Sequence, residues 1–108
     1  MSWHIWPLLL FSLGALVFAA TPGSLTAMRK AELRNLVVQD CGSCHGLTMK
    51  GGLGRPLLPA NLKGLPDETV ANIILDGVGG TPMPPWRDLL TEPEALWIAQ
   101  SLKQGLDR

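Results

Sequence analysis

The sequence of 108 residues predicts an all-α fold. Three segments place apolar residues three and four positions apart, as one face of a helix does, and no segment shows the alternation of a half-buried strand. Between these segments, residues 46–64 and 77–85 are rich in glycine and proline. We therefore expect about three main helices joined by long irregular loops.

The first 20 residues have the pattern of an export signal. An apolar run over residues 8–18 ends at the small residues Ala19 and Ala20, where cleavage is expected. The run is shorter than the roughly 20 residues that span a bilayer, and no lysine or arginine lies before it. That missing basic start leaves an uncleaved membrane anchor as the alternative. We expect a signal at 1–20 and one domain at 21–108.

The expected domain contains all nine basic and all nine acidic residues, so its formal net charge is zero. No basic stripe interleaved with aromatic residues is present, and nucleic acid is therefore not an expected partner. A chain of about 88 residues buries only a marginal core by itself.

The first helix is expected to run from Ser24 or Thr26, either of which can cap it, towards Asp40. Three apolar residues and then two cysteines share one face of this helix, namely Leu33, Leu36, Val37, Cys41 and Cys44. The first helix therefore delivers the cysteines to the loop that follows.

The second helix should begin at residues 66–68, Pro-Asp-Glu, and end at Gly77. A capping box over residues 91–94 should open the last helix, which runs to about Gln104 before Gly105. The inward faces of these two helices are expected to carry Val70, Ile73, Ile74, Ala95, Ile98, Ala99 and Leu102.

The residues Cys41 to His45 read Cys-Gly-Ser-Cys-His, and Cys-x-x-Cys-His is the attachment sequence of a c-type haem. Cys41 and Cys44 can each add a sulfur to one vinyl group of the porphyrin, and His45 then becomes the proximal iron ligand. Because c-type haem is attached outside the bacterial membrane, this motif agrees with the export signal. The expected location is the periplasm, and the haem would supply the core that the short chain lacks.

Other uses of the two cysteines have less support in the sequence. They are the only cysteines, so a four-cysteine iron–sulfur site is impossible. A zinc site would need His4 at the far N-terminus, and a thioredoxin-like pair needs a preceding strand. A thiol redox pair or a chance occurrence of the motif remains as the alternative.

A second axial ligand would close the iron and favour electron transfer over ligand binding. Met83 lies between prolines in an extended loop, which would present its thioether, and it is the expected distal ligand. Met28 precedes the cysteines on the first helix, and Met49 is too near His45 in sequence to reach the opposite face. The alternative for Met83 is that it fills a gap against Trp86.

Together these motifs resemble class I cytochrome c over essentially the whole of residues 21–108. The resemblance rests on Cys-Gly-Ser-Cys-His-Gly, a glycine-rich loop with Arg55-Pro56-Leu57, and Gly77-Val78-Gly79-Gly80 followed by Met83-Pro84-Pro85-Trp86. It implies a cytochrome c fold with crossing terminal helices around one covalent haem c, and His45 and Met83 as axial ligands. It also implies that the Pro56 carbonyl accepts a hydrogen bond from the His45 ring and orients it.

Two positions depart from the pattern of that family. Ser101 stands where an aromatic residue usually packs against the first helix and the haem, and Trp97 one turn earlier is expected to replace it. Arg55 stands where many relatives have glycine. We interpret it as a solvated loop charge; the alternative is a cation near the proximal haem edge.

More narrowly, the chain is similar to the small periplasmic cytochromes encoded beside cytochrome cd nitrite reductase in denitrifying bacteria. This similarity implies a monomeric one-electron carrier, not an enzyme, that passes electrons to the reductase. Transfer would use the haem edge bordered by Gly42, Ser43, Met83 and Pro84. The alternative is a partner or tailoring protein in haem d maturation, where Trp86 and Trp97 could stack on a second tetrapyrrole.

Overall fold

The computed structural model describes residues 14–16 and 24–106, and all regular structure within them is helical. Three helices have ten or more residues: α1 (Ala27–Leu36), α4 (Asp67–Asp76) and α5 (Glu92–Gln104). Shorter elements are η1 (Val37–Cys41), α2 (Gly42–His45) and α3 (Pro59–Leu62). The expected signal at residues 1–20 lies outside the described residues, except for 14–16.

Helix α1 begins where the sequence predicts, because the Thr26 hydroxyl accepts a hydrogen bond from the Arg29 amide at 3.0 Å. The chain then continues into η1, a single π-helical turn in which the Gly42 amide donates to the Val37 carbonyl five residues earlier. Helix α2 follows without a break and ends at Gly46, whose φ of 89° stops the helix. The expected single helix is therefore α1, η1 and α2 in series.

Helix α5 starts with the predicted capping box. The Thr91 hydroxyl accepts from the Glu94 amide, and the Glu94 carboxylate accepts from the Thr91 amide at 3.0 Å. Helix α4 has Asp67 and Glu68 in its first turn, where carboxylates complement the helix dipole. Gly77 ends α4 with a φ of 66°.

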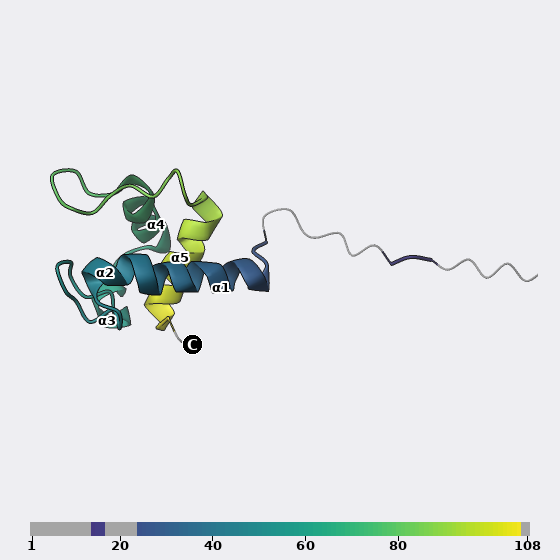
Figure 1. Cartoon of the computed structure of the whole chain (residues 1–108), viewed down its shortest axis with the longest axis horizontal. Coiled ribbons are helices and arrows are strands. Elements are labelled where there is room, and N and C mark those ends of the chain that lie inside the picture. Colours follow the sequence, from purple (N-terminus) through teal and green to yellow (C-terminus); the bar gives the residue numbers. More distant parts are fainter. Residues whose placement is uncertain (1–13, 17–23, 107–108) are drawn as a thin grey trace, which may run out of the picture.

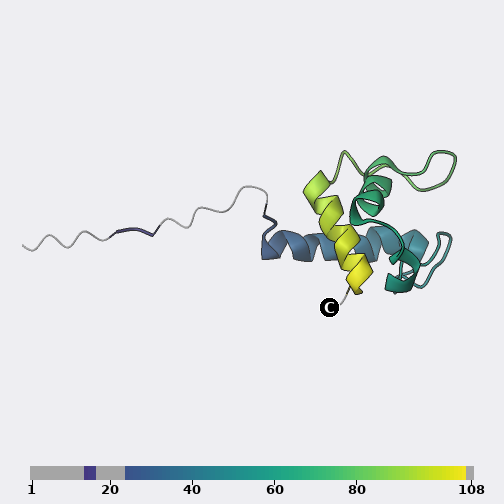
Figure 2. The same cartoon turned by 180° about the vertical axis from the view of Figure 1, so that it is seen from behind.

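The core lies where α1 crosses α5, and Figures 1 and 2 show this crossing from opposite sides. Fully buried side chains at the crossing and against α4 include Leu33, Val37, Ile98 and Leu75. Arg29 of α1 binds Glu94 of α5 through a 2.7 Å contact between Nε and Oε1. Burial of the apolar side chains, at about 1.5–3 kcal/mol each, provides most of the packing energy between these helices.

Two long loops lie on the same side of the domain (Figure 1). Residues 46–58 form one loop beside α2, and residues 77–91 form the other after α4. Within residues 14–16 and 24–106, no helix is long and apolar enough to cross a membrane.

Candidate haem-binding site

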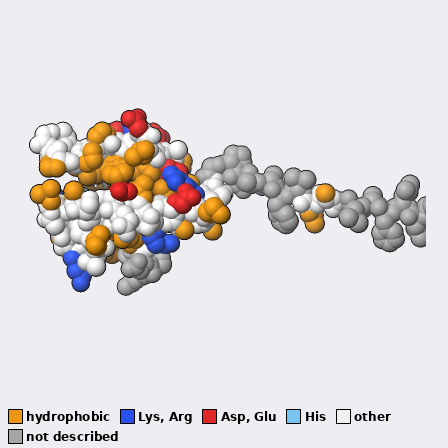
Figure 3. All heavy atoms as spheres, in the orientation of Figure 1, with side chains coloured by type: hydrophobic (Ala, Val, Ile, Leu, Met, Phe, Trp, Pro, Cys, Tyr) orange, Lys and Arg blue, Asp and Glu red, His pale blue; other side chains and the backbone are white. Residues whose placement is uncertain are grey.

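A cleft of about 740 Å³ opens between the two loops. Cys41, Cys44, His45 and Met83 all line it. Most of its wall is apolar. The aliphatic residues in it are Leu53, Leu57, Leu62, Leu65, Val70, Ile73, Ile74, Val78, Leu90, Ile98 and Leu102. Figure 3 shows hydrophobic side chains gathered on this face of the domain. The volume is within the range of a cofactor pocket, and its chemistry fits a large apolar ring.

Both thiols are half-buried at the start of this cleft and form no disulfide. Burial, with the nearby Asp40 carboxylate, raises the pKa of the Cys41 thiol to about 11. Reactive thiol pairs use a thiolate of lowered pKa, so the raised pKa disfavours the thiol redox alternative. No three histidine, cysteine or acidic residues are grouped to hold a metal in the described part of the chain, and His4, which the zinc alternative needs, lies outside it.

The His45 ring is oriented by a backbone carbonyl, but the acceptor is Arg55 and not Pro56. His45 Nδ1 lies 2.7 Å from the Arg55 carbonyl oxygen. Because a carbonyl can only accept, Nδ1 carries the proton and Nε2 keeps its lone pair for a metal. The prediction for Pro56 is wrong by one residue. The Pro56 ring instead packs on Gly51, where a Cβ would lie 3.2 Å from Pro56 Cγ.

The first loop folds back closely on α2. The Gly54 amide donates to the Cys44 carbonyl and the Gly51 amide to the His45 carbonyl, both at 2.8 Å. Met49, in the same loop, is buried in the core with a φ of 60° and does not line the cleft. Its exclusion as an iron ligand therefore agrees with its position, although the reason includes core packing as well as sequence distance.

The second loop presents Met83 through a short network of its own. The Val78 amide donates to the Met83 carbonyl at 3.2 Å, and the Met83 amide donates to the Thr81 hydroxyl at 3.3 Å. That hydroxyl donates in turn to the Val78 carbonyl at 2.7 Å. Gly77 packs against the backbone of residues 83–85 of the same loop, and a Cβ at Gly77 would be 2.7 Å from the Met83 carbonyl oxygen. The loop is therefore closed by its own backbone around Met83.

The two tryptophans have different surroundings. Trp86 is half-buried and lines the cleft beside Met83. Trp97 lies outside the cleft, with the Arg34 guanidinium 5.9 Å from its ring centroid. Trp97 therefore contacts α1 as expected of the missing aromatic residue at Ser101, but it does not line the cleft.

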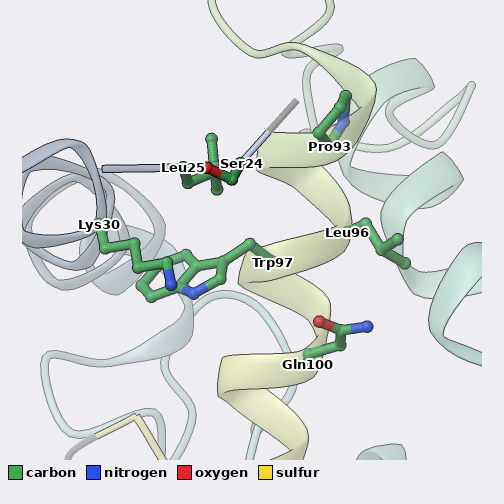
Figure 4. A pocket seen from close by; sticks show the side chains of 7 residues that line it. All are labelled: Ser24, Leu25, Lys30, Pro93, Leu96, Trp97 and Gln100. Carbon is green, nitrogen blue, oxygen red and sulfur yellow. The ribbon is translucent and has the colours of Figure 1, made fainter. Parts of the chain in front are cut away.

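Trp97 instead lines a separate hollow of about 320 Å³ between α5 and the start of α1 (Figure 4). Lys30, Leu25 and Pro93 also line this hollow, and no sulfur or imidazole does. It is therefore not a candidate for the haem.

Only some of the residues predicted to border the exposed haem edge line the cleft. Ser43, Met83 and Pro84 line it, whereas Gly42 does not. Gly42 is buried, and a Cβ there would lie 3.3 Å from the Leu47 side chain. Helix α2 turns Gly42 towards Leu47. Leu47 and Leu53 are 65% and 79% exposed beside the motif, and sequence reasoning did not single them out.

Comparison with known proteins identifies the family. A family model described as cytochrome c oxidase, cbb3-type, subunit III matches residues 29–100. The chain is 58% identical over 83 residues to cytochrome c55X of Paracoccus denitrificans (strain Pd 1222), which covers 77% of this chain and 81% of that protein. The chain belongs to the c-type cytochromes, in the cytochrome c55X family. A second relative, cytochrome c55X of Stutzerimonas stutzeri, is 42% identical over 95 residues, with coverage of 88% and 81%.

Solved structures agree with the assignment to the c-type cytochromes. The c-type cytochrome NirC matches with a TM-score of 0.73 and 48% identity, over 75% of this chain and 95% of that one. A structure titled dihydro-heme d1 dehydrogenase NirN in complex with DHE matches with a TM-score of 0.62 and 32% identity, over 68% of this chain but 16% of that one. The predicted all-α cytochrome c fold is confirmed. The chain is a c-type cytochrome that carries covalent haem c and transfers electrons, and it is not an enzyme.

Proposed function

We propose that the chain is a periplasmic, monomeric one-electron carrier with a single haem. Cys41 and Cys44 would hold the haem through thioether bonds, and His45 and Met83 would bind its iron from the two sides. The observation that carries this proposal is the shared cleft, which is lined by both cysteines, an imidazole with a free Nε2 and one thioether. Residues 1–20 would direct export and be removed.

The bound haem would supply the Fe(III)/Fe(II) couple. The protein's part is to keep the coordination fixed: the Arg55 carbonyl holds the His45 ring, and the closed loop of Val78, Thr81 and Met83 holds the thioether. A thioether ligand favours Fe(II), so the potential should be positive. Because neither ligand needs to leave, the electron can pass with little nuclear motion.

The surface around the cysteine motif suits brief docking of a redox partner. Leu53 lines the cleft and is 79% exposed, and Leu47, two residues after His45, is 65% exposed; exposed apolar side chains near the motif support weak association. A formal net charge of zero predicts little long-range steering. The partner that we propose is cytochrome cd nitrite reductase.

Optical spectra of the holoprotein test the ligation. The ferric wild type should show the weak far-red band of methionine–iron bonding, and Met83→Ala should lose it while keeping covalent haem. Met28→Ala is the matched control, because Met28 is 76% exposed on α1 and away from the cleft. A high-spin spectrum in the wild type would contradict a closed carrier site.

The partner is tested by mixing the reduced protein with purified cytochrome cd nitrite reductase and following haem oxidation after nitrite is added. Rapid oxidation at micromolar concentrations, dependent on the reductase, is the expected result. No oxidation would favour the second candidate function.

That second candidate is an electron acceptor or partner in haem d maturation. The structural match to a dihydro-heme d1 dehydrogenase favours it, because a dehydrogenation releases two electrons that need an acceptor. Reduction of the ferric protein by that dehydrogenase and its tetrapyrrole substrate would support this role over the first.

A further inference from the structure

Arg55 is the one basic residue, other than His45, among the described residues that line the cleft. Asp40 is the one acidic residue that lines it, and the rest of the wall is neutral. Asp40 precedes Cys41, so it lies at the end of the cleft where the thioether bonds would form. The cleft therefore has a single permanent positive charge, on the loop beside His45.

The Arg55 guanidinium has no partner within the described part of the chain. Three other arginines there are engaged: Arg29 with Glu94 and Glu32, Arg87 with Asp76 and Glu92, and Arg34 with the Leu106 carbonyl and Trp97. No hydrogen bond or ion pair is formed by the Arg55 side chain with any described residue. Its backbone, in contrast, is fixed by the contact of its carbonyl with His45 Nδ1 at 2.7 Å.

Arg55 is exposed and also lines the cleft, so a ring that fills the cleft would lie beside this cation, and a negative charge on the ring would stabilise it. Haem carries its own counter-charge as two carboxylates, the propionates, on the side of the porphyrin away from both vinyl groups. Asp40 would repel these carboxylates from the thioether end, and Arg55 would attract them.

We infer that Arg55 pairs with a haem propionate and raises the reduction potential of the iron; this inference rests on the proposed haem site. The positive charge neutralises a carboxylate close to the iron and so disfavours the extra charge of Fe(III). Arg55 is thus a positioning residue with an electrostatic effect, in addition to its backbone role beneath His45. Arg55 is exposed, as the interpretation of a solvated loop charge expects, and this inference takes up the alternative of a cation near the proximal haem edge.

Spectroelectrochemical titration of the holoprotein tests this inference. Arg55→Gln should lower the midpoint potential, so that at a fixed ambient potential the Fe(III)/Fe(II) ratio rises about three- to tenfold. Arg55→Lys should restore most of the shift. Lys50→Gln is the control, because Lys50 is an exposed cation of the same loop that does not line the cleft. The Lys50→Gln substitution should change the midpoint potential less, and this change should vanish near 1 M salt, where the Debye length is about 3 Å.

Resonance Raman spectra give a second readout, since the propionate bending band should move in Arg55→Gln and stay in Lys50→Gln. Equal shifts of potential in the Gln variants, or an unmoved propionate band, would overturn the inference. So would an Arg55→Lys protein that behaves like Arg55→Gln. Retained low-spin spectra would show in each case that the haem site itself is intact, whereas a high-spin wild type would count against the proposed function instead.

Discussion

Gly54 lies directly against the ring of His45: a Cβ at Gly54 would be 2.8 Å from both Nδ1 and Cε1 of that ring. The carbonyl of the next residue, Arg55, accepts a hydrogen bond from His45 Nδ1. Two consecutive loop residues therefore fix the imidazole, one by contact and one by a hydrogen bond. The spacing of residues in the sequence does not predict this arrangement, because ten residues of chain separate Arg55 from His45.

Gly54→Ala should displace the His45 ring. Carbon atoms do not approach ring atoms at 2.8 Å, so the loop or the ring must move, at a cost of about 1–3 kcal/mol. We expect a lower midpoint of guanidinium denaturation and a perturbed haem spectrum. Gly64→Ala is the control, since nothing lies within 4 Å of a Cβ at Gly64. Equal stabilities of the two variants would contradict the contact.

Gly77→Ala should disturb the opposite ligand. Gly77 has a φ of 66°, and its Cβ would also be 2.7 Å from the Pro84 carbonyl carbon and the Pro85 nitrogen. Backbone strain of about 1–3 kcal/mol would therefore act on the loop that carries Met83. The ferric methionine–iron band should weaken or disappear. Gly79→Ala, whose Cβ meets nothing within 4 Å, should keep it; a normal band in both variants would refute the prediction.

Glu94→Gln should destabilise the crossing of α1 and α5 in a pH-dependent way. The hydrogen bond from Arg29 holds the pKa of the Glu94 carboxyl below its ordinary value. A lowered folded-state pKa contributes stability above the unfolded value, about 4.3, and that contribution disappears as pH falls through the folded value. The variant should lose about 1–3 kcal/mol near neutral pH, and less as the pH is lowered below about 4.

Denaturant titrations at several pH values would measure this difference. Glu32→Gln is the matched control, because Glu32 binds the same guanidinium at 2.9 Å but its side chain is 57% exposed. Exposed pairs contribute about 0–1 kcal/mol, so little change is expected. A loss in Glu94→Gln that does not depend on pH would assign its effect to packing instead of charge.

Leu53→Ser should slow electron transfer to the partner while the haem stays attached and low-spin. Leu53 lines the cleft but is 79% exposed, so its loss removes apolar contact mainly in the complex. A reduction of about fivefold in the second-order rate corresponds to about 1 kcal/mol of docking energy. Leu89→Ser changes a leucine that is 66% exposed and outside the cleft, and it should leave the rate unchanged. Similar rates for both variants would place docking elsewhere.

Local sequence signals predicted most of the fold. Caps at Thr26 and Thr91 and the glycine after α4 act through neighbours a few residues away, so the sequence contains their partners. The motif at Cys41 likewise places three site residues within five positions. The prolines around Met83 mark a loop that presents its side chain, and Met83 lines the cleft; its bond to iron stays a prediction.

Features that depend on distant packing were missed. Helix α3 is one turn long and lies in a segment whose glycines and prolines indicate a loop. The predicted acceptor for the His45 ring is Pro56 and the observed one is Arg55, because sequence spacing does not say which loop residue lies opposite the ring. The burial of Gly42 depends on where Leu47 folds, which no periodicity encodes.

The π-helical turn of Val37–Cys41 sets the rotation between the buried face of α1 and the helix face that carries the haem motif. Leu33 before the turn and Val37 at its first position are buried against the rest of the domain, and Cys44 and His45 after the turn line the cleft. Each residue of an α-helix turns the following face by about 100°, so one residue removed from this turn would rotate the motif away from the cleft while leaving α1 in place. Substitutions within the turn should consequently be tolerated far better than a single deletion there.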